Sequence, residues 1–142
     1  MEKIKPSHRS KARSLALQAI YQWQLTGDSA TDIRNQFEEK ITTKKVDLAY
    51  FHTLLDGVVI QVATVDQQFI PLLDRKVDDL DMVELAVLRL AVYELLYRTE
   101  IPHKVVINEA LELTKTFGSC DGYRYINGVL DSLLSSLPSS TG

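Results

Sequence analysis

A long run of apolar residues in the middle of this chain, spaced by alternating steps of four and three, is compatible with a helix and little else. It begins after Asp47, and its members are Phe51, Leu55, Val58, Val62, Val65, Phe69 and Leu72. This spacing places every member on one helical face, whereas a strand needs alternation at every second residue. The β-branched residues between Val58 and Val62 favour a strand, but the sustained spacing overrides that local propensity. We therefore expect one long helix that ends near Pro71.

Further helical patterns fill the rest of the chain, and no segment carries a convincing alternation of apolar and polar residues. The same spacing predicts helices at about residues 9–25, around Ile33 and Phe37, and at 82–97, 104–117 and 121–137. The segment 82–97 is apolar nearly all round, which is typical of a central helix contacted on several sides.

These patterns predict an all-α protein of about seven helices, arranged as two packed bundles. We expect the bundles to comprise residues 1–76 and 77–142, with the seam in the acidic segment 76–81. Ser29 or Thr31 is suited to begin the second helix as its N-cap. Gly118 is suited to end the helix before the last.

The composition indicates a globular protein of one compact, two-lobed domain. Of 142 residues, 45% are hydrophobic and 25% are charged. The single cysteine, Cys120, excludes an intramolecular disulfide framework and a cysteine-based zinc site. The most apolar stretch, 82–97, contains three charged residues and is too short to span a bilayer. With no apolar signal-peptide core near the N-terminus, a cytoplasmic protein with no membrane partner is expected.

Positive charge is concentrated at the N-terminus. The first 13 residues hold one acidic side chain and five basic ones, namely Lys3, Lys5, Arg9, Lys11 and Arg13. Their net charge of +4 contrasts with −3 for the whole chain, which leaves −7 for the remainder. This asymmetry suits local binding of a polyanion by an otherwise acidic body.

The arm continues into one face of the first helix. Arg9 and Arg13 are four residues apart, and Leu17 and Tyr21 continue that face. Guanidinium groups match phosphate geometry, and an exposed tyrosine can stack on an unpaired base. Because the helix dipole disfavours cations at this end, the charge indicates a use beyond solvation. On these residues alone, nucleic-acid binding and an ordinary solvated helix start both stay open.

A second candidate contact surface lies at the start of the last predicted helix. Asp121, Arg124 and Tyr125 cluster there beside Gly122 and Tyr123. A helix N-cap is the default role of Asp121, and a base-edge contact by its carboxylate is the alternative. Two tyrosines two residues apart cannot share a helical face, so we expect at most one of them in the core and the other exposed.

Enzyme chemistry has little support in this sequence. The chain carries neither a glycine-rich phosphate loop after a strand nor a zinc-binding His-Glu-x-x-His helix. Its histidines are scattered, and Glu109 and Glu112 are better explained as one face of a helix. The acid next to Cys120 disfavours a thiolate. We therefore predict no catalytic residue, no metal site and no cofactor.

Four segments, in this order and spacing, closely resemble the NusB family of bacterial transcription antitermination factors. They are ARSLALQAIYQWQL, VELAVLRLAVYELLYR, IPHKVVINEALELTKTFG and YINGVLD, and the resemblance extends from about Arg9 to Leu134. It implies an all-α fold of two helical bundles and a non-enzymatic RNA-binding factor. The implied partners are boxA RNA of ribosomal RNA leaders and NusE, a small-subunit ribosomal protein. Other Nus factors and RNA polymerase would be indirect partners.

The resemblance also implies roles for individual residues. The basic N-terminal motif of the family corresponds to Lys5, Arg9, Lys11 and Arg13, although Ser10 interrupts the basic run. The implied RNA contacts elsewhere are Tyr21, Asp121, Arg124 and Tyr125, and Glu84 is the implied NusE contact. A similar helical module occurs in ribosomal RNA cytosine methyltransferases, but this chain is too short to add the catalytic domain. A pure protein-interaction scaffold, whose basic arm binds an acidic partner, is the remaining alternative.

Overall fold

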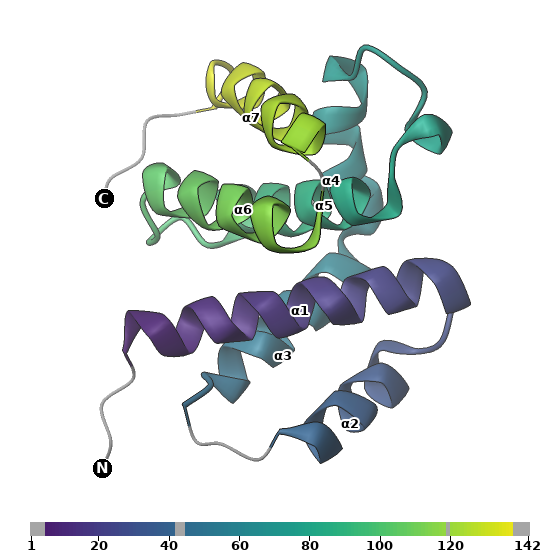
Figure 1. The fold of residues 1–142 in the computed structure, drawn as a ribbon, viewed down its shortest axis with the longest axis vertical. Coiled ribbons are helices and arrows are strands. Elements are labelled where there is room, and N and C mark those ends of the chain that lie inside the picture. Colours follow the sequence, from purple (N-terminus) through teal and green to yellow (C-terminus); the bar gives the residue numbers. More distant parts are fainter. Residues whose placement is uncertain (1–4, 42–44, 119, 138–142) are drawn as a thin grey trace.

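The computed structural model describes residues 5–41, 45–118 and 120–137, so Lys3 lies outside the described part. The described part contains seven α-helices and two short 3-10 helices (Figure 1). Their bounds are α1 (Pro6–Thr26), α2 (Ala30–Lys40), α3 (Leu48–Ile60), α4 (Val62–Phe69), η1 (Ile70–Leu72), η2 (Val77–Asp79), α5 (Met82–Tyr97), α6 (His103–Phe117) and α7 (Cys120–Leu134). The prediction of an all-α fold with about seven helices is confirmed.

The single long helix expected between Asp47 and Pro71 is wrong. It is two helices, α3 and α4, which meet at Gln61, and the second part is bent by 76° from the first. The bend turns the apolar face of α4 onto α5, so that Val65 and Phe69 are fully buried. A straight continuation of α3 would not place these two side chains against the same neighbour.

The helices form two groups that meet along α1 and α5. Figure 1 shows α1, α2 and α3 together on one side, and α4, α5, α6 and α7 on the other. The middle of α5 is buried from Leu85 to Leu95 except at Arg89, as expected for a central helix. The division into residues 1–76 and 77–142 stays a prediction. Helix α4 lies before this division in the chain but packs onto α5 and α7, which lie after it.

Side-chain caps fix several helix starts. Ser29 accepts a hydrogen bond from the Asp32 amide and begins α2, as the sequence predicts. Asp47 accepts from the Tyr50 amide at the start of α3, and Asp81 accepts from the first-turn amides of α5. Local sequence therefore determines where these helices begin.

None of the helices in the described part is by itself long and apolar enough to cross a membrane. The bent pair Leu48–Ile60 and Val62–Leu72 reaches the required length and composition only when its two parts are taken together.

Candidate nucleic-acid interface

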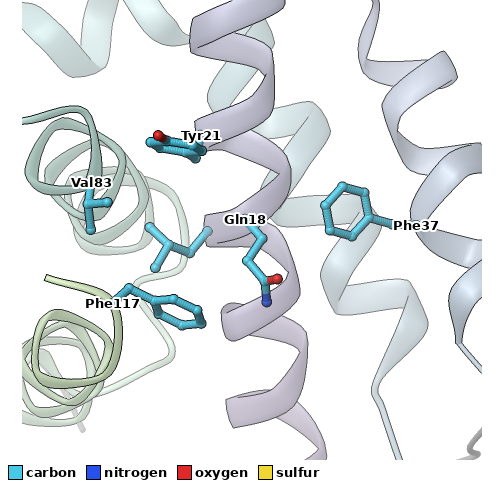
Figure 2. A pocket seen from close by; sticks show the side chains of 6 residues that line it. Gln18, Tyr21, Phe37, Val83 and Phe117 are labelled. Atoms are coloured by element: carbon cyan, nitrogen blue, oxygen red, sulfur yellow. The ribbon is translucent and has the colours of Figure 1, made fainter.

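The second half of α1 lines an apolar hollow between the two groups of helices. Tyr21 is 37% exposed and opens onto a space of about 310 Å³. Figure 2 shows the residues around it, which are Leu17, Gln18, Tyr21, Phe37, Val83 and Phe117. Phe117, at the end of α6, is also exposed. Tyr21 therefore lies among apolar side chains, away from the cations of the arm.

Glu84, the predicted partner contact, lies one residue after Val83 in the first turn of α5. It is half-buried, and this burial raises the pKa of its carboxyl group. The negative charge of Asp81 raises that pKa further, whereas Arg75 lowers it. A cation brought by a partner would favour the charged form of Glu84.

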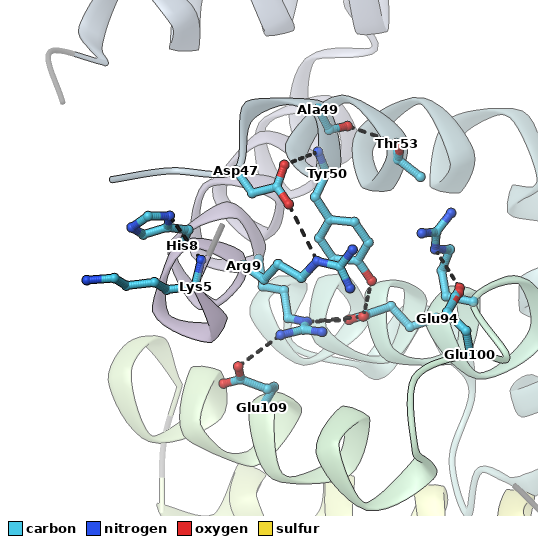
Figure 3. Close-up of polar contacts among 12 residues, drawn as sticks. Lys5, His8, Arg9, Asp47, Ala49, Tyr50, Thr53, Glu94, Glu100 and Glu109 are labelled. Carbon is cyan, nitrogen blue, oxygen red and sulfur yellow. Dashed lines mark hydrogen bonds and ion pairs between the residues drawn. The ribbon is translucent and has the colours of Figure 1, made fainter. Parts of the chain in front are cut away.

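The first turn of α1 presents basic side chains to solvent. The helix begins at Pro6. Proline lacks a backbone N–H, but the first N–H groups of a helix have no intrahelical acceptor, so no hydrogen bond is lost there. Lys5 and Lys11 are exposed, and no acidic residue occupies the first turn. The Lys5 amide donates to Nδ1 of His8 at 3.3 Å, which ties the arm to the helix (Figure 3).

Arg9 is half-exposed and anchored to the start of α3. Its Nε lies 3.4 Å from Oδ2 of Asp47, and its guanidinium carbon lies 4.6 Å from the centre of the Tyr50 ring (Figure 3). The Asp47 amide donates to the carbonyl of His8 at 3.1 Å. Asp47 therefore joins the first turns of α1 and α3 and holds Arg9 at the surface.

Arg13 does not belong with the exposed cations, and its burial argues against the predicted RNA contact. Its side chain is 4% exposed, and its Nε lies 2.9 and 3.1 Å from the two carboxylate oxygens of Glu94. Its Nη1 donates to Glu109 at 2.9 Å, and the Ser10 hydroxyl donates to the same carboxylate. These bonds direct the guanidinium into the protein, where a phosphate would have to displace two carboxylates.

The buried charges of this network stabilise one another. Burial alone lowers the pKa of Arg13, but the hydrogen bond and charge of Glu94 outweigh it, so that the pKa lies above its ordinary value. The Tyr50 hydroxyl donates to Glu94 at 2.5 Å. Burial raises the pKa of Tyr50, and the charge of Glu94 raises it further. The network thereby links α1, α3, α5 and α6 through protonated donors and charged acceptors.

Sequence reasoning overlooked Tyr50 and Glu94. The available signal was Glu94 itself, an acidic residue inside a helix that is otherwise apolar nearly all round. A buried carboxylate of this kind needs a cationic or hydrogen-bonding partner. Arg13 and Tyr50 are those partners.

The second predicted cluster lies within helix α7. The helix begins at Cys120, so that Asp121 lies in its exposed first turn instead of at the N-cap. Arg124 is exposed, and the half-buried Tyr125 has the guanidinium carbon of Arg75 4.1 Å from its ring centre. Arg75 is in turn held by Asp74, with 2.7 Å between Nε and Oδ1. One face of the Tyr125 ring is therefore already covered by a planar cation.

Tyr123 and Tyr125 are both half-buried, and neither is fully enclosed in the core. Tyr125 packs against the hydrophobic core, which agrees with the expectation of at most one core tyrosine, whereas Tyr123 is half-buried and not exposed as expected. Each ring contacts a cation: Nζ of Lys115 lies 5.1 Å from the Tyr123 ring centre, and Arg75 covers Tyr125. Among the residues with described positions, no group of three or more His, Cys, Asp or Glu side chains could hold a metal ion.

Comparison with known proteins gives consistent results along nearly the whole chain. A model of the NusB family matches residues 10–135. "Transcription antitermination protein NusB" of Tolumonas auensis is 55% identical over 131 residues, which cover 92% of this chain and 95% of that protein. The protein of the same name from Shewanella amazonensis is 50% identical over 131 residues, covering 92% and 98%.

Solved structures with the same fold include two close matches. One is described as the "Crystal Structure of Antitermination Factors NusB and NusE in complex with dsRNA", with a TM-score of 0.84 and 25% identity, covering 94% of this chain and all of that one. The other is NusB of T. maritima, with a TM-score of 0.81 and 26% identity, covering 97% and 95%.

Proposed function

This chain belongs to the NusB family of transcription antitermination proteins, and from that premise we propose that it binds the boxA element of ribosomal RNA leaders together with NusE. The complex would act on RNA polymerase with the other Nus factors, in the cytoplasm. As a member of a family of transcription factors, the protein is not an enzyme. Its contribution is to bind and position its partners.

The observation that carries the RNA proposal is the set of exposed cations at the start of α1. Lys5, Arg9 and Lys11 all reach solvent there, whereas the chain as a whole is acidic. Cations placed against phosphates supply most of the sequence-independent affinity for RNA. A similar structure, described as NusB and NusE in complex with dsRNA, supports the binding of RNA together with NusE.

The cluster on α7 is the proposed second RNA contact. Arg124 is exposed for a phosphate, and the carboxylate of Asp121 is exposed for a hydrogen bond with a base edge. Tyr125 would add a stacked contact through the guanidinium of Arg75, which lies over its ring. These contacts to bases, more than those of the arm, would provide the preference for one RNA sequence.

The hollow around Tyr21 is the proposed docking surface for NusE. Apolar side chains from α1, α5 and α6 line it, and Glu84 lies beside Val83 on α5. Tyr21 is therefore better suited to a protein partner than to a base. A ribosomal protein is typically basic, which complements the acidic remainder of this chain.

Fluorescence anisotropy with a labelled single-stranded RNA tests this function. We expect the affinity for a boxA RNA to exceed that for a scrambled RNA of the same length, and to rise further when NusE is added. Equal binding of both RNAs, unaffected by NusE, would reduce the arm to a nonspecific binder of polyanions. Binding of NusE without any binding of RNA would instead indicate a protein-interaction scaffold.

A further inference from the structure

A second hollow, of about 490 Å³, lies between the start of α1 and the segment that comprises the connection between α5 and α6 and the first half of α6. Pro6 and Arg9 line it on one side, and Ile101, Pro102 and Val105 line it on the other. Val105 is 40% exposed although it is apolar. Lys5 and Arg13 also line the hollow, so several cations and a set of apolar walls lie within one small space.

Arg9 gives this hollow a flat, charged surface in a fixed position. The ring of Tyr50 lies against its guanidinium, and Asp47 holds its Nε. Tyr50 is itself held by its hydrogen bond with Glu94. A guanidinium plane that is fixed in this way can stack with a nucleobase on its remaining face.

We propose that the hollow receives one unpaired base of the bound RNA, stacked on Arg9, with the adjoining phosphate near Lys5. This inference deepens the proposed RNA-binding function and depends on it. In this proposal Arg9 does more than attract phosphates by its charge, because it also stacks on a base.

The lining of the hollow favours a base over a phosphate inside it. A phosphate would gain nothing from Pro6, Ile101 and Val105, and it would lose its hydration. The carboxylates of Glu100 and Glu109 also line the space, but each is paired with an arginine, Glu100 with Arg98 and Glu109 with Arg13, so the preference for a base depends on the apolar walls. A nucleobase is flat, largely apolar on its faces and uncharged. Its N–H edge can donate to a carboxylate, such as that of Glu100.

The test scans a boxA RNA with one abasic nucleotide at a time, bound to the full chain in the presence of saturating NusE. We expect one position at which loss of the base weakens binding by about tenfold, as for other stacked bases. Val105→Trp should fill the hollow, so that the intact RNA binds as weakly as the abasic RNA. The sensitivity to that abasic position should then disappear.

A second variant separates stacking from charge. Arg9→Lys keeps the cation and removes the plane, so that sensitivity to the abasic position should be lost while the salt dependence of binding stays unchanged. Ile60→Trp is the matched control for bulk, because Ile60 is 75% exposed at the end of α3. Arg34→Lys is the matched control for charge, because Arg34 pairs with Asp56 between α2 and α3.

Crosslinking of the unaltered chain keeps the test independent of how the variants fold. 4-Thiouridine at the sensitive position should crosslink to residues 5–9 or 98–105, and a crosslink only elsewhere would overturn the proposal. The proposal would also be overturned if Val105→Trp and Arg9→Lys retained the sensitivity to the abasic position. A Val105→Trp variant that loses only the binding of NusE would overturn it as well. Failure of the unaltered chain to bind any RNA would overturn the proposed function itself.

Discussion

Arg13 on α1 and Glu94 on α5 form a buried ion pair, in which Nε of the arginine lies 2.9 and 3.1 Å from the two carboxylate oxygens. The pair joins the two groups of helices at the point where α1 crosses the central helix. An arginine that the sequence placed among RNA contacts is thereby part of the protein's internal structure.

Arg13→Ala is expected to reduce the free energy of unfolding by about 3–5 kcal/mol, because it leaves Glu94 buried without its cation. Urea denaturation monitored by circular dichroism measures the loss. Arg34→Ala is the matched control: its pair with Asp56 is partly exposed, and the expected loss is below about 1 kcal/mol. A folded Arg13→Ala variant of normal stability with weakened RNA binding would restore the role that the sequence suggested.

The salt dependence of RNA binding reports how many arm cations contact phosphates. With Lys5, Arg9 and Lys11 available and Arg13 buried, we expect the arm to contribute about −2 to the slope of log affinity against log salt, from about 0.7 per contact. Lys11→Ala should make the measured slope shallower by about 0.7. Lys40→Ala, at the exposed end of α2, should leave it unchanged. Equal slopes for the chain with and without Lys11 would remove that residue from the contact surface.

Gly57→Ala is expected to destabilise the fold, although alanine favours a helix by about 1 kcal/mol. A Cβ atom at this position would lie 2.2 Å from Cζ of Tyr93, so that the ring or a helix must move. We expect a net loss of about 1–3 kcal/mol in urea unfolding.

Gly128→Ala is the matched control for this substitution. Its added Cβ meets nothing within 4 Å on α7, so it should raise stability by about 0.5–1 kcal/mol. If both variants gain stability equally, the packing of the Tyr93 ring against α3 leaves room for a methyl group at position 57.

Alkaline pH should weaken the network around Tyr50. Because folding raises the pKa of this hydroxyl above its ordinary value, the stability that it contributes is complete below about pH 10 and decreases at higher pH. At neutral pH the free energy of unfolding of the unaltered chain should exceed that of Tyr50→Phe by about 1.5–3 kcal/mol, which is the range for a hydrogen bond to a charged acceptor.

Above pH 10 this difference should shrink by about 1.4 kcal/mol per pH unit, which urea unfolding at a series of pH values can follow. Tyr93 and Tyr125, whose pKa values burial also raises, are present in both proteins and cancel in the difference. If the difference in the free energy of unfolding stays constant up to pH 11, ionisation of Tyr50 does not cause the loss of stability at alkaline pH.

Local sequence predicted the helices well and the orientation of their faces poorly. Apolar spacing and caps such as Ser29 act within a few residues, so that helix positions follow from them. The spacing continues unbroken through Gln61, however, and therefore gives no sign that α4 turns onto α5. Spacing also placed Arg9 and Arg13 on one face without indicating that α5 and α6 cover that face at Arg13.

The cluster on α7 could be found from sequence, but its environment could not. Arg75, which covers Tyr125, is fifty residues earlier in the chain and lies between η1 and η2. No local pattern connects the two residues. Only the packing of α7 near this connection brings them together.

The hollow beside Arg9 has one wall on α1 and the other on the α5–α6 connection and the first half of α6. Arg13 joins α1 to α5 through Glu94 and to α6 through Glu109. The width of the hollow is therefore set when the chain folds, before any RNA arrives. Because both walls are already in place, binding of a base would not include the free-energy cost of ordering them. Preorganisation of this kind lets a small, largely acidic protein retain RNA through few contacts.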